Sequence, residues 1–134
     1  MNSELLLREH DLKVTPQRLG ILSLMKIKGH VDVEELFLTM KKQFSSISLA
    51  TLYKNVNAML EKQLITEIKA PKLKAKYEIV KEPHIHLLCK ECNEFVDLDI
   101  NLETLIDDAS KKSNYQLEES CVVLSGLCEK CQTN

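Results

Sequence analysis

Residues 84–92 read His84-Ile-His86-Leu-Leu-Cys89-Lys-Glu-Cys92, and a second Cys-x2-Cys pair follows at Cys128-Glu-Lys-Cys131. Each pair places two thiolates on one side of a tight turn, so two pairs complete a tetrahedral shell of four sulfurs. The 35 intervening residues, 93–127, suffice for a strand, a helix and a strand that bring the pairs together. Zinc suits such a shell because it has no redox chemistry and accepts four sulfurs at about 2.3 Å. The four cysteines therefore predict a closed zinc site that holds the fold together and does not catalyse.

The histidines beside the first pair indicate a second metal site. Residues two apart in a strand point to the same face, so His84 and His86 can reach one ion. Carboxylates close in the sequence are those of Glu78, Glu82, Asp97 and Asp99. Imidazole and carboxylate together suit Fe(II), Mn(II) or Zn(II). The alternative interpretation is a pair of ordinary surface histidines.

The N-terminal part is typical of a helical domain. Thr15 is a good N-cap with Pro16 in the first turn, and Gly29 ends the apolar periodicity that follows. Asp32 opens a third helix, and Ser48 caps a fourth over roughly 49–63. Strands at 64–69 and 76–80 flank a basic hairpin tip, 70–74. This order is typical of a winged helix-turn-helix, with helix 49–63 in the major groove; the alternative is a small α+β domain whose polar helix face is only solvated.

Composition and charge set the broad class. The chain has 134 residues, 44% hydrophobic and 28% charged, and no apolar run approaches the roughly 20 residues of a membrane span. Without a signal-peptide pattern, a cytoplasmic protein with no membrane association is expected. Residues 1–80 hold 13 basic and 9 acidic side chains (net +4), whereas residues 81–134 hold 5 and 11 (net −6). A basic N-terminal part fits a nucleic-acid partner.

Together these patterns predict an α+β protein of two domains. A winged-helix DNA-binding domain occupies 1–80, residues 81–83 form a hinge, and a small α/β domain for dimerisation and metal sensing occupies 84–134. Five cysteines in a reducing compartment favour metal binding over disulfides. For the fifth, Cys121, the alternating pattern of 115–127 favours a buried small hydrophobe over a reactive thiol.

With these residues in view, the chain resembles the ferric uptake regulator family over essentially its whole length. The matching motifs are Thr15-Pro16-Gln17-Arg18, Gly29-His30, Ser48-Leu-Ala-Thr-Leu-Tyr53-Lys-Asn55, His84-x-His86-x2-Cys89-x2-Cys92 and Cys128-x2-Cys131. The resemblance implies a homodimeric, metal-dependent transcription repressor with structural Zn²⁺ and a regulatory site for Fe²⁺ or Mn²⁺. Carried onto this chain, the regulatory ligands are His30, Glu78, His84, His86 and Asp97. An ion held by residues of both domains would favour the DNA-competent arrangement.

Tyr53-Lys-Asn55 and Asp97 are more similar to the peroxide-responsive branch of the family. In that branch a ferrous ion reacts with hydrogen peroxide and a ligating imidazole, here His30 or His84, is oxidised, which releases the repressor from DNA. Glu78 departs from the branch, which has Asp at this position. The alternative is therefore an iron-responsive uptake repressor, or a zinc- or manganese-responsive one.

The resemblance also implies an A·T-rich inverted-repeat operator in double-stranded DNA. Predicted phosphate contacts are Lys13, Arg18, Lys72, Lys74 and Lys76, and predicted base-edge contacts are Thr51, Tyr53, Lys54 and Asn55. No enzymatic activity is expected: a zinc hydrolase or deaminase needs an open zinc position, and the usual deaminase motif is absent. The third interpretation is a protein-interaction module that zinc holds together and that does not bind DNA.

Overall fold

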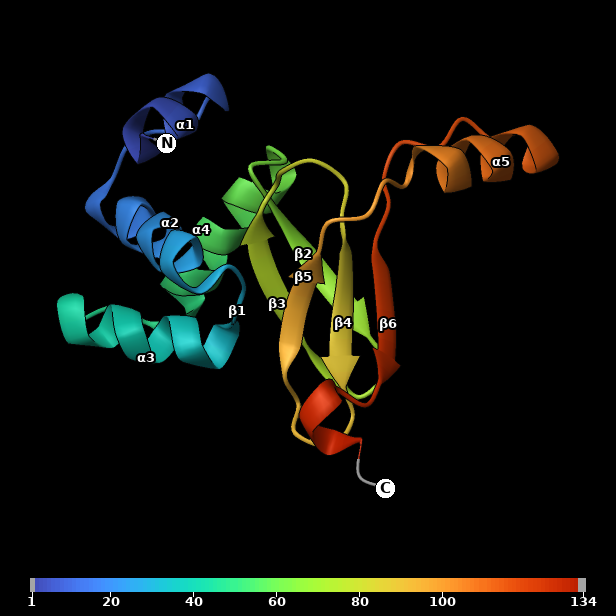
Figure 1. Ribbon diagram of the computed structural model, residues 1–134. Helices are drawn as coiled ribbons and strands as arrows, with labels where there is room; N and C mark the ends of the chain where they lie inside the picture. The colour runs from blue at the N-terminus through green and yellow to red at the C-terminus, as the bar shows by residue number, and fades with distance from the viewer. Residues whose placement is uncertain (1, 133–134) are drawn as a thin grey trace. The chain divides into compact units, whose positions relative to one another are not determined.

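The computed structural model describes residues 2–132, which fall into two compact units that divide between residues 80 and 81. Each unit is mixed α+β, as the sequence predicts (Figure 1). None of the helices over the described residues combines the length and apolar character that crossing a bilayer requires.

The first unit packs four helices with a three-stranded sheet. The helices are α1 (Ser3–Glu9), α2 (Pro16–Lys28), α3 (Val33–Gln43) and α4 (Leu49–Glu61), and the strands are β1 (Val31–Asp32), β2 (Ile65–Ala70) and β3 (Leu73–Ile79). The sheet order is β1-β3-β2, all antiparallel. This order of helices followed by a hairpin is the winged-helix arrangement.

Side-chain caps explain where the helices begin. The Thr15 hydroxyl accepts from the Arg18 amide, Asp32 from Glu35, and Ser48 from Thr51. Each cap satisfies an amide that the first turn leaves without a partner. Gly29 closes α2 at φ 83°, a left-handed conformation that favours glycine.

A continuous apolar core holds this unit together. Fully buried side chains come from every helix and from the hairpin: Leu7, Ile21, Leu22, Leu36, Met40, Leu52, Val56, Met59 and Ile65 are examples. Leu52, Val56 and Met59 form one stripe of α4, so this helix is fixed through its apolar face. Its opposite face, including Tyr53 and Lys54, is exposed.

The hairpin differs from the prediction. The tip expected at 70–74 is only two residues long, because Ala70 ends β2 and Leu73 begins β3. Lys72 adopts φ 64°, which permits this tight reversal, and the register shifts between Ile68 and Ala70.

The second unit is a three-stranded sheet with one helix. Its elements are β4 (Ile85–Cys89), β5 (Phe95–Leu98), α5 (Glu103–Ser113), β6 (Val122–Gly126) and a short 3₁₀ turn η1 (Glu129–Cys131). The order is β5-β4-β6, with β4 antiparallel to β5 and parallel to β6. Within the alternating segment 115–127, only Val122–Gly126 forms a strand, and residues 115–121 lie outside it.

One detail of this unit corrects the sequence interpretation. Cys121 directly precedes β6 and is exposed, so the expectation of a buried side chain is wrong. The alternation that suggested burial lies partly in a segment that is not a strand. The amphipathic helix α5 has no buried residue, and Leu105 is 57% exposed.

Candidate metal centres

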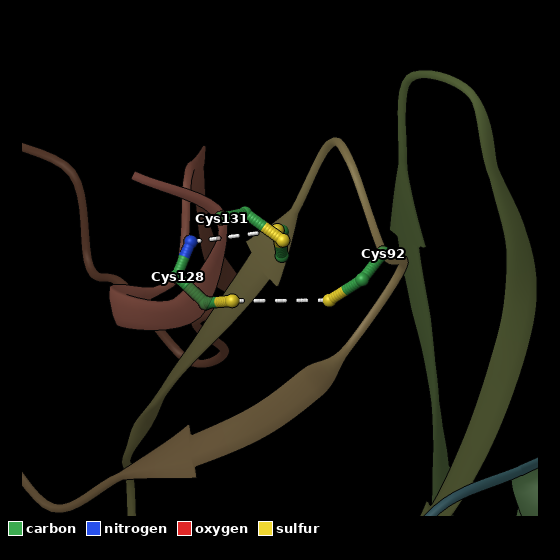
Figure 2. Close-up of side chains that lie close together, drawn as sticks. Cys92, Cys128 and Cys131 are labelled. Carbon is green, nitrogen blue, oxygen red and sulfur yellow. Dashed lines mark hydrogen bonds between the residues drawn. The ribbon is translucent and has the colours of Figure 1, made fainter. Parts of the chain in front are cut away.

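The four-cysteine cluster is produced by the parallel pairing of β4 and β6. In parallel strands the carboxyl ends lie at the same edge of the sheet, and Cys89 pairs with Gly126. Cys89 ends β4 and Cys92 follows in the turn, while Cys128 and Cys131 bracket η1 just after β6. Figure 2 shows Cys128 and Cys131 on this turn facing Cys92.

The distances within this cluster fit a zinc ion. The four cysteine sulfurs all lie within 4.8 Å of one another. The Cys92 and Cys128 sulfurs are 3.8 Å apart (Figure 2). Two sulfurs at about 2.3 Å from a tetrahedral zinc are separated by about 3.8 Å. All five cysteines are free thiols, so none of the four is engaged in a disulfide.

Backbone amides lower the pKa of one of the four thiols, that of Cys89. The Cys128 amide donates to the Cys89 sulfur at 3.4 Å. Amides of Cys128, Cys92 and Glu91 together lower the pKa of Cys89 to about 6. Hydrogen bonds among the thiols raise the pKa of Cys131 to about 12, with Cys128 as the main cause. The amides thus favour the thiolate form of Cys89, which is the form that binds a metal ion.

The second cluster lies in the same unit and consists of His84, His86 and Asp97. His86 in β4 pairs in register with Asp97 in β5, and His84 lies two residues before His86. One donor atom of each residue lies within 4.8 Å of the others. The structure thus brings both imidazoles beside one carboxylate, and that His84 and His86 bind one ion stays a prediction.

One nitrogen of each imidazole faces the Asp97 carboxylate, and His84 Nε2 is 3.8 Å from Asp97 Oδ1. The Nδ1 atom of His84 is 2.9 Å from the Glu82 carbonyl oxygen, which can only accept. The Nδ1 atom of His86 is 2.8 Å from Asp97 Oδ1. With the Nδ1 proton of His84 on the Glu82 carbonyl, its Nε2 carries the lone pair, so His84 Nε2, His86 Nδ1 and Asp97 Oδ1 are the atoms that could hold one ion.

Packing fixes the orientation of these rings. The His86 side chain is only 4% exposed and stacks on Phe95 with ring centroids 5.1 Å apart. The His84 ring meets His86 edge-on at 4.5 Å. Neutral imidazoles and a carboxylate form a donor set for Fe(II), Mn(II) or Zn(II), in contrast to the all-sulfur cluster.

The remaining predicted ligands belong to the first unit. His30 follows the C-cap of α2 and is partly exposed. Glu78 lies near the end of β3 and is 3% exposed. Burial of a carboxylate is costly unless it is paired or bound to a cation.

The residues predicted to contact DNA all lie in the first unit. Lys13, Tyr53, Lys54, Lys72 and Lys74 are exposed, whereas Arg18, Thr51, Asn55 and Lys76 are partly buried. Lys74 is paired with Glu34 at 2.9 Å, and this carboxylate raises the pKa of Lys74.

Arg18 and Asn55 form a hydrogen-bonded network that sequence reasoning did not find. Arg18 Nε donates to Asn55 Oδ1 at 3.2 Å, and Asn55 Nδ2 donates to Gln17 Oε1 at 3.2 Å. Arg18 Nη1 also donates to the Lys13 carbonyl at 3.1 Å. The network links the start of α2 to the middle of α4. Residues 37 positions apart gave no local signal for it.

Comparison with known proteins shows which family the chain belongs to. The model of the ferric uptake regulator family matches residues 9–125. The peroxide operon regulator of Bacillus subtilis is 24% identical over 93% of this chain and 88% of its own length. The Campylobacter jejuni peroxide stress regulator structure is 37% identical, with TM-score 0.78 over 98% of this chain and 100% of that one. The Francisella tularensis ferric uptake regulator, solved with iron, is 25% identical, with TM-score 0.72 over 91% and 96% of the two chains.

The family match covers most of the chain, and the fold and both donor clusters agree with it. The protein therefore belongs to the ferric uptake regulator family.

Proposed function

We propose that this protein is a metal-dependent DNA-binding repressor that senses peroxide through oxidation of a ligand histidine. The observation that carries the proposal is the convergence of His84, His86 and Asp97. It forms a second, nitrogen- and oxygen-rich site in the unit that also contains the four-cysteine cluster. Zinc in the sulfur cluster would hold this unit together while the second site responds to metal.

The regulatory ion would be Fe²⁺ or Mn²⁺, with His30 and Glu78 as the ligands from the first unit. Glu78 is a buried carboxylate only six residues before His84 in the chain. An ion that binds ligands from both units favours one arrangement of them, and by linkage DNA and metal would strengthen each other's binding. The DNA-binding domain would be 1–80, with 81–83 as the hinge.

The operator would be an A·T-rich inverted repeat in double-stranded DNA, bound by a homodimer. The dimer is supported by an uncovered apolar face in the second unit. Val96, Leu98 and Leu124 lie on one side of the sheet by register with Ile85 and Leu87, and they are 39%, 39% and 54% exposed. An apolar face of this kind is typical of a protein interface.

Peroxide sensing is supported by the names of the similar proteins from Bacillus subtilis and Campylobacter jejuni. Bound Fe²⁺ would supply the reductive activation of hydrogen peroxide. One oxygen atom would enter a C–H bond of His30 or His84, and the other would leave as water. The modified imidazole is a poorer ligand, so the ion would be lost and DNA released.

Iron-responsive repression is the second candidate, because Glu78 carries one methylene more than the aspartate of the peroxide branch. Such a side chain reaches further into the position that peroxide would occupy.

The test uses zinc-loaded protein and A·T-rich inverted-repeat DNA. Operator binding should appear with Fe²⁺ or Mn²⁺ and be lost in His84→Ala and His86→Ala, while both variants keep one zinc per chain. Dilute peroxide should add one oxygen to His30 or His84 in the Fe²⁺ form and none in the Mn²⁺ form, as peptide mass spectrometry would detect. Unmodified histidines with retained DNA binding would support iron sensing, and failure to bind such DNA with any metal would refute the repressor.

A further inference from the structure

The ammonium group of Lys81 contacts the second metal site, which His84, His86 and Asp97 form. The Lys81 ammonium lies 2.7 Å from Asp97 Oδ2, in a salt bridge within the second unit. The other carboxylate oxygen, Oδ1, is 2.8 Å from His86 Nδ1 and 3.8 Å from His84 Nε2. Lys81 therefore contacts the one carboxylate of this three-residue cluster.

A metal ion and an ammonium compete for such a carboxylate. Asp97 supplies the negative charge among the three, since the two imidazoles are neutral when they act as ligands. Two cations within about 4 Å of each other repel, and the repulsion is stronger at a partly buried site than in water. The Asp97 side chain is 28% exposed and that of His86 is 4% exposed, so solvent screens only part of this repulsion.

We propose that the Lys81 ammonium competes with the metal ion for the Asp97 carboxylate, and so sets the metal concentration at which the site fills. This inference rests on the proposed function, in which His84, His86 and Asp97 hold the regulatory ion. When the ion binds, the ammonium leaves Asp97 and enters solvent. The Lys81 side chain is already 52% exposed, so the ammonium has solvent to move into.

The exposure of Lys81 determines how much its removal should change the affinity of the site for metal ions. A lysine that is half in solvent forms a weak ion pair, so its removal should tighten ion binding by roughly 2- to 5-fold. Because the competition is electrostatic, Mn²⁺ and Zn²⁺ should gain by similar factors, which changes the response threshold and not the choice of ion. The gain should shrink as salt screens the pair.

The experiment compares Lys81→Met with Lys81→Arg and Lys112→Met in the full zinc-loaded chain. Lys112→Met is a matched control because Lys112 is exposed and pairs with Asp108 on α5, so the same charge is removed away from the cluster. Binding of Mn²⁺ is measured from the free-ion signal in electron paramagnetic resonance, at about 50 and about 500 mM NaCl. Lys81→Met should bind Mn²⁺ roughly 2- to 5-fold more tightly at low salt, and both controls should match the wild type.

A second measurement follows the ammonium itself. Acetylation of surface lysines, quantified by peptide mass spectrometry, should label Lys81 faster once Mn²⁺ is bound and leave the rate at Lys112 unchanged. A lysine with only a structural role would show no such increase.

Unchanged or weaker Mn²⁺ binding in folded Lys81→Met would overturn the competitor role, as would a Lys81 labelling rate that Mn²⁺ does not raise. Wild-type protein that binds no ion beyond zinc would overturn the proposed function, and this inference with it.

Discussion

The network of Arg18, Asn55 and Gln17 gives the sharpest prediction about DNA binding. Both Arg18 and Asn55 were predicted to touch DNA directly. In the structure the Asn55 amide is already occupied, since Oδ1 accepts from Arg18 and Nδ2 donates to Gln17 and to the Thr51 carbonyl. We therefore expect Asn55 to position the Arg18 guanidinium toward a phosphate, and Asn55→Ala to act through Arg18.

The magnitude follows from the geometry. A hydrogen bond with one charged partner contributes about 1.5–3 kcal/mol, and the length of 3.2 Å and partial exposure place this one at the lower end. Loss of about 1.5 kcal/mol corresponds to roughly a tenfold change in affinity. Asn55→Ala should weaken DNA binding by up to about tenfold, and Arg18→Ala by at least as much. Arg18→Ala should also lower the slope of log K against log salt by about 0.9, the value for one phosphate contact.

The assay is a double-mutant cycle on metal-loaded protein, with fluorescence anisotropy on one operator at several salt concentrations. If Asn55 acts through Arg18, the double variant binds no more weakly than Arg18→Ala alone, and the coupling energy is about 1–1.5 kcal/mol. Additive losses would refute the positioning role, as would a change in preferred base pairs caused by Asn55→Ala in both backgrounds.

Three further predictions concern the two units. Cys131→Ser should lose zinc, measured by elemental analysis, and lower the melting temperature of the second unit, because the described part of this unit buries few apolar side chains. Leu52→Ala should destabilise the first unit by about 2–5 kcal/mol in urea unfolding, since Leu52 is fully buried, and leave the zinc content unchanged. In zinc-free protein, thiolate absorbance at 240 nm should show one step near pH 6, from the lowered pKa of Cys89, that Cys89→Ser removes; titration of every thiol near its ordinary pKa would contradict this.

Local signals in the sequence predicted much of the fold. The caps at Thr15, Asp32 and Ser48 act within three residues, so their chemistry can be read directly from the chain. The two Cys-x2-Cys turns and the spacing of His84 and His86 are equally local, and the structure groups them as expected.

Long-range pairing could not be predicted in the same way. The two-residue strand β1 exists because Val31 and Asp32 pair with β3, and so short a segment has no periodicity of its own. The parallel pairing of β4 with β6 likewise depends on residues almost 40 positions apart. The exposed position of Cys121 follows from where β6 begins, which the alternating pattern placed too early.

We propose that one ion is bound by histidines of both units. Electron–nuclear double resonance on the Mn²⁺ form of the zinc-loaded protein counts the imidazole nitrogens bound to the ion. Three nitrogens are predicted, from His30, His84 and His86, falling to two in His30→Ala. A wild-type count of two that His30→Ala leaves unchanged would contradict the claim.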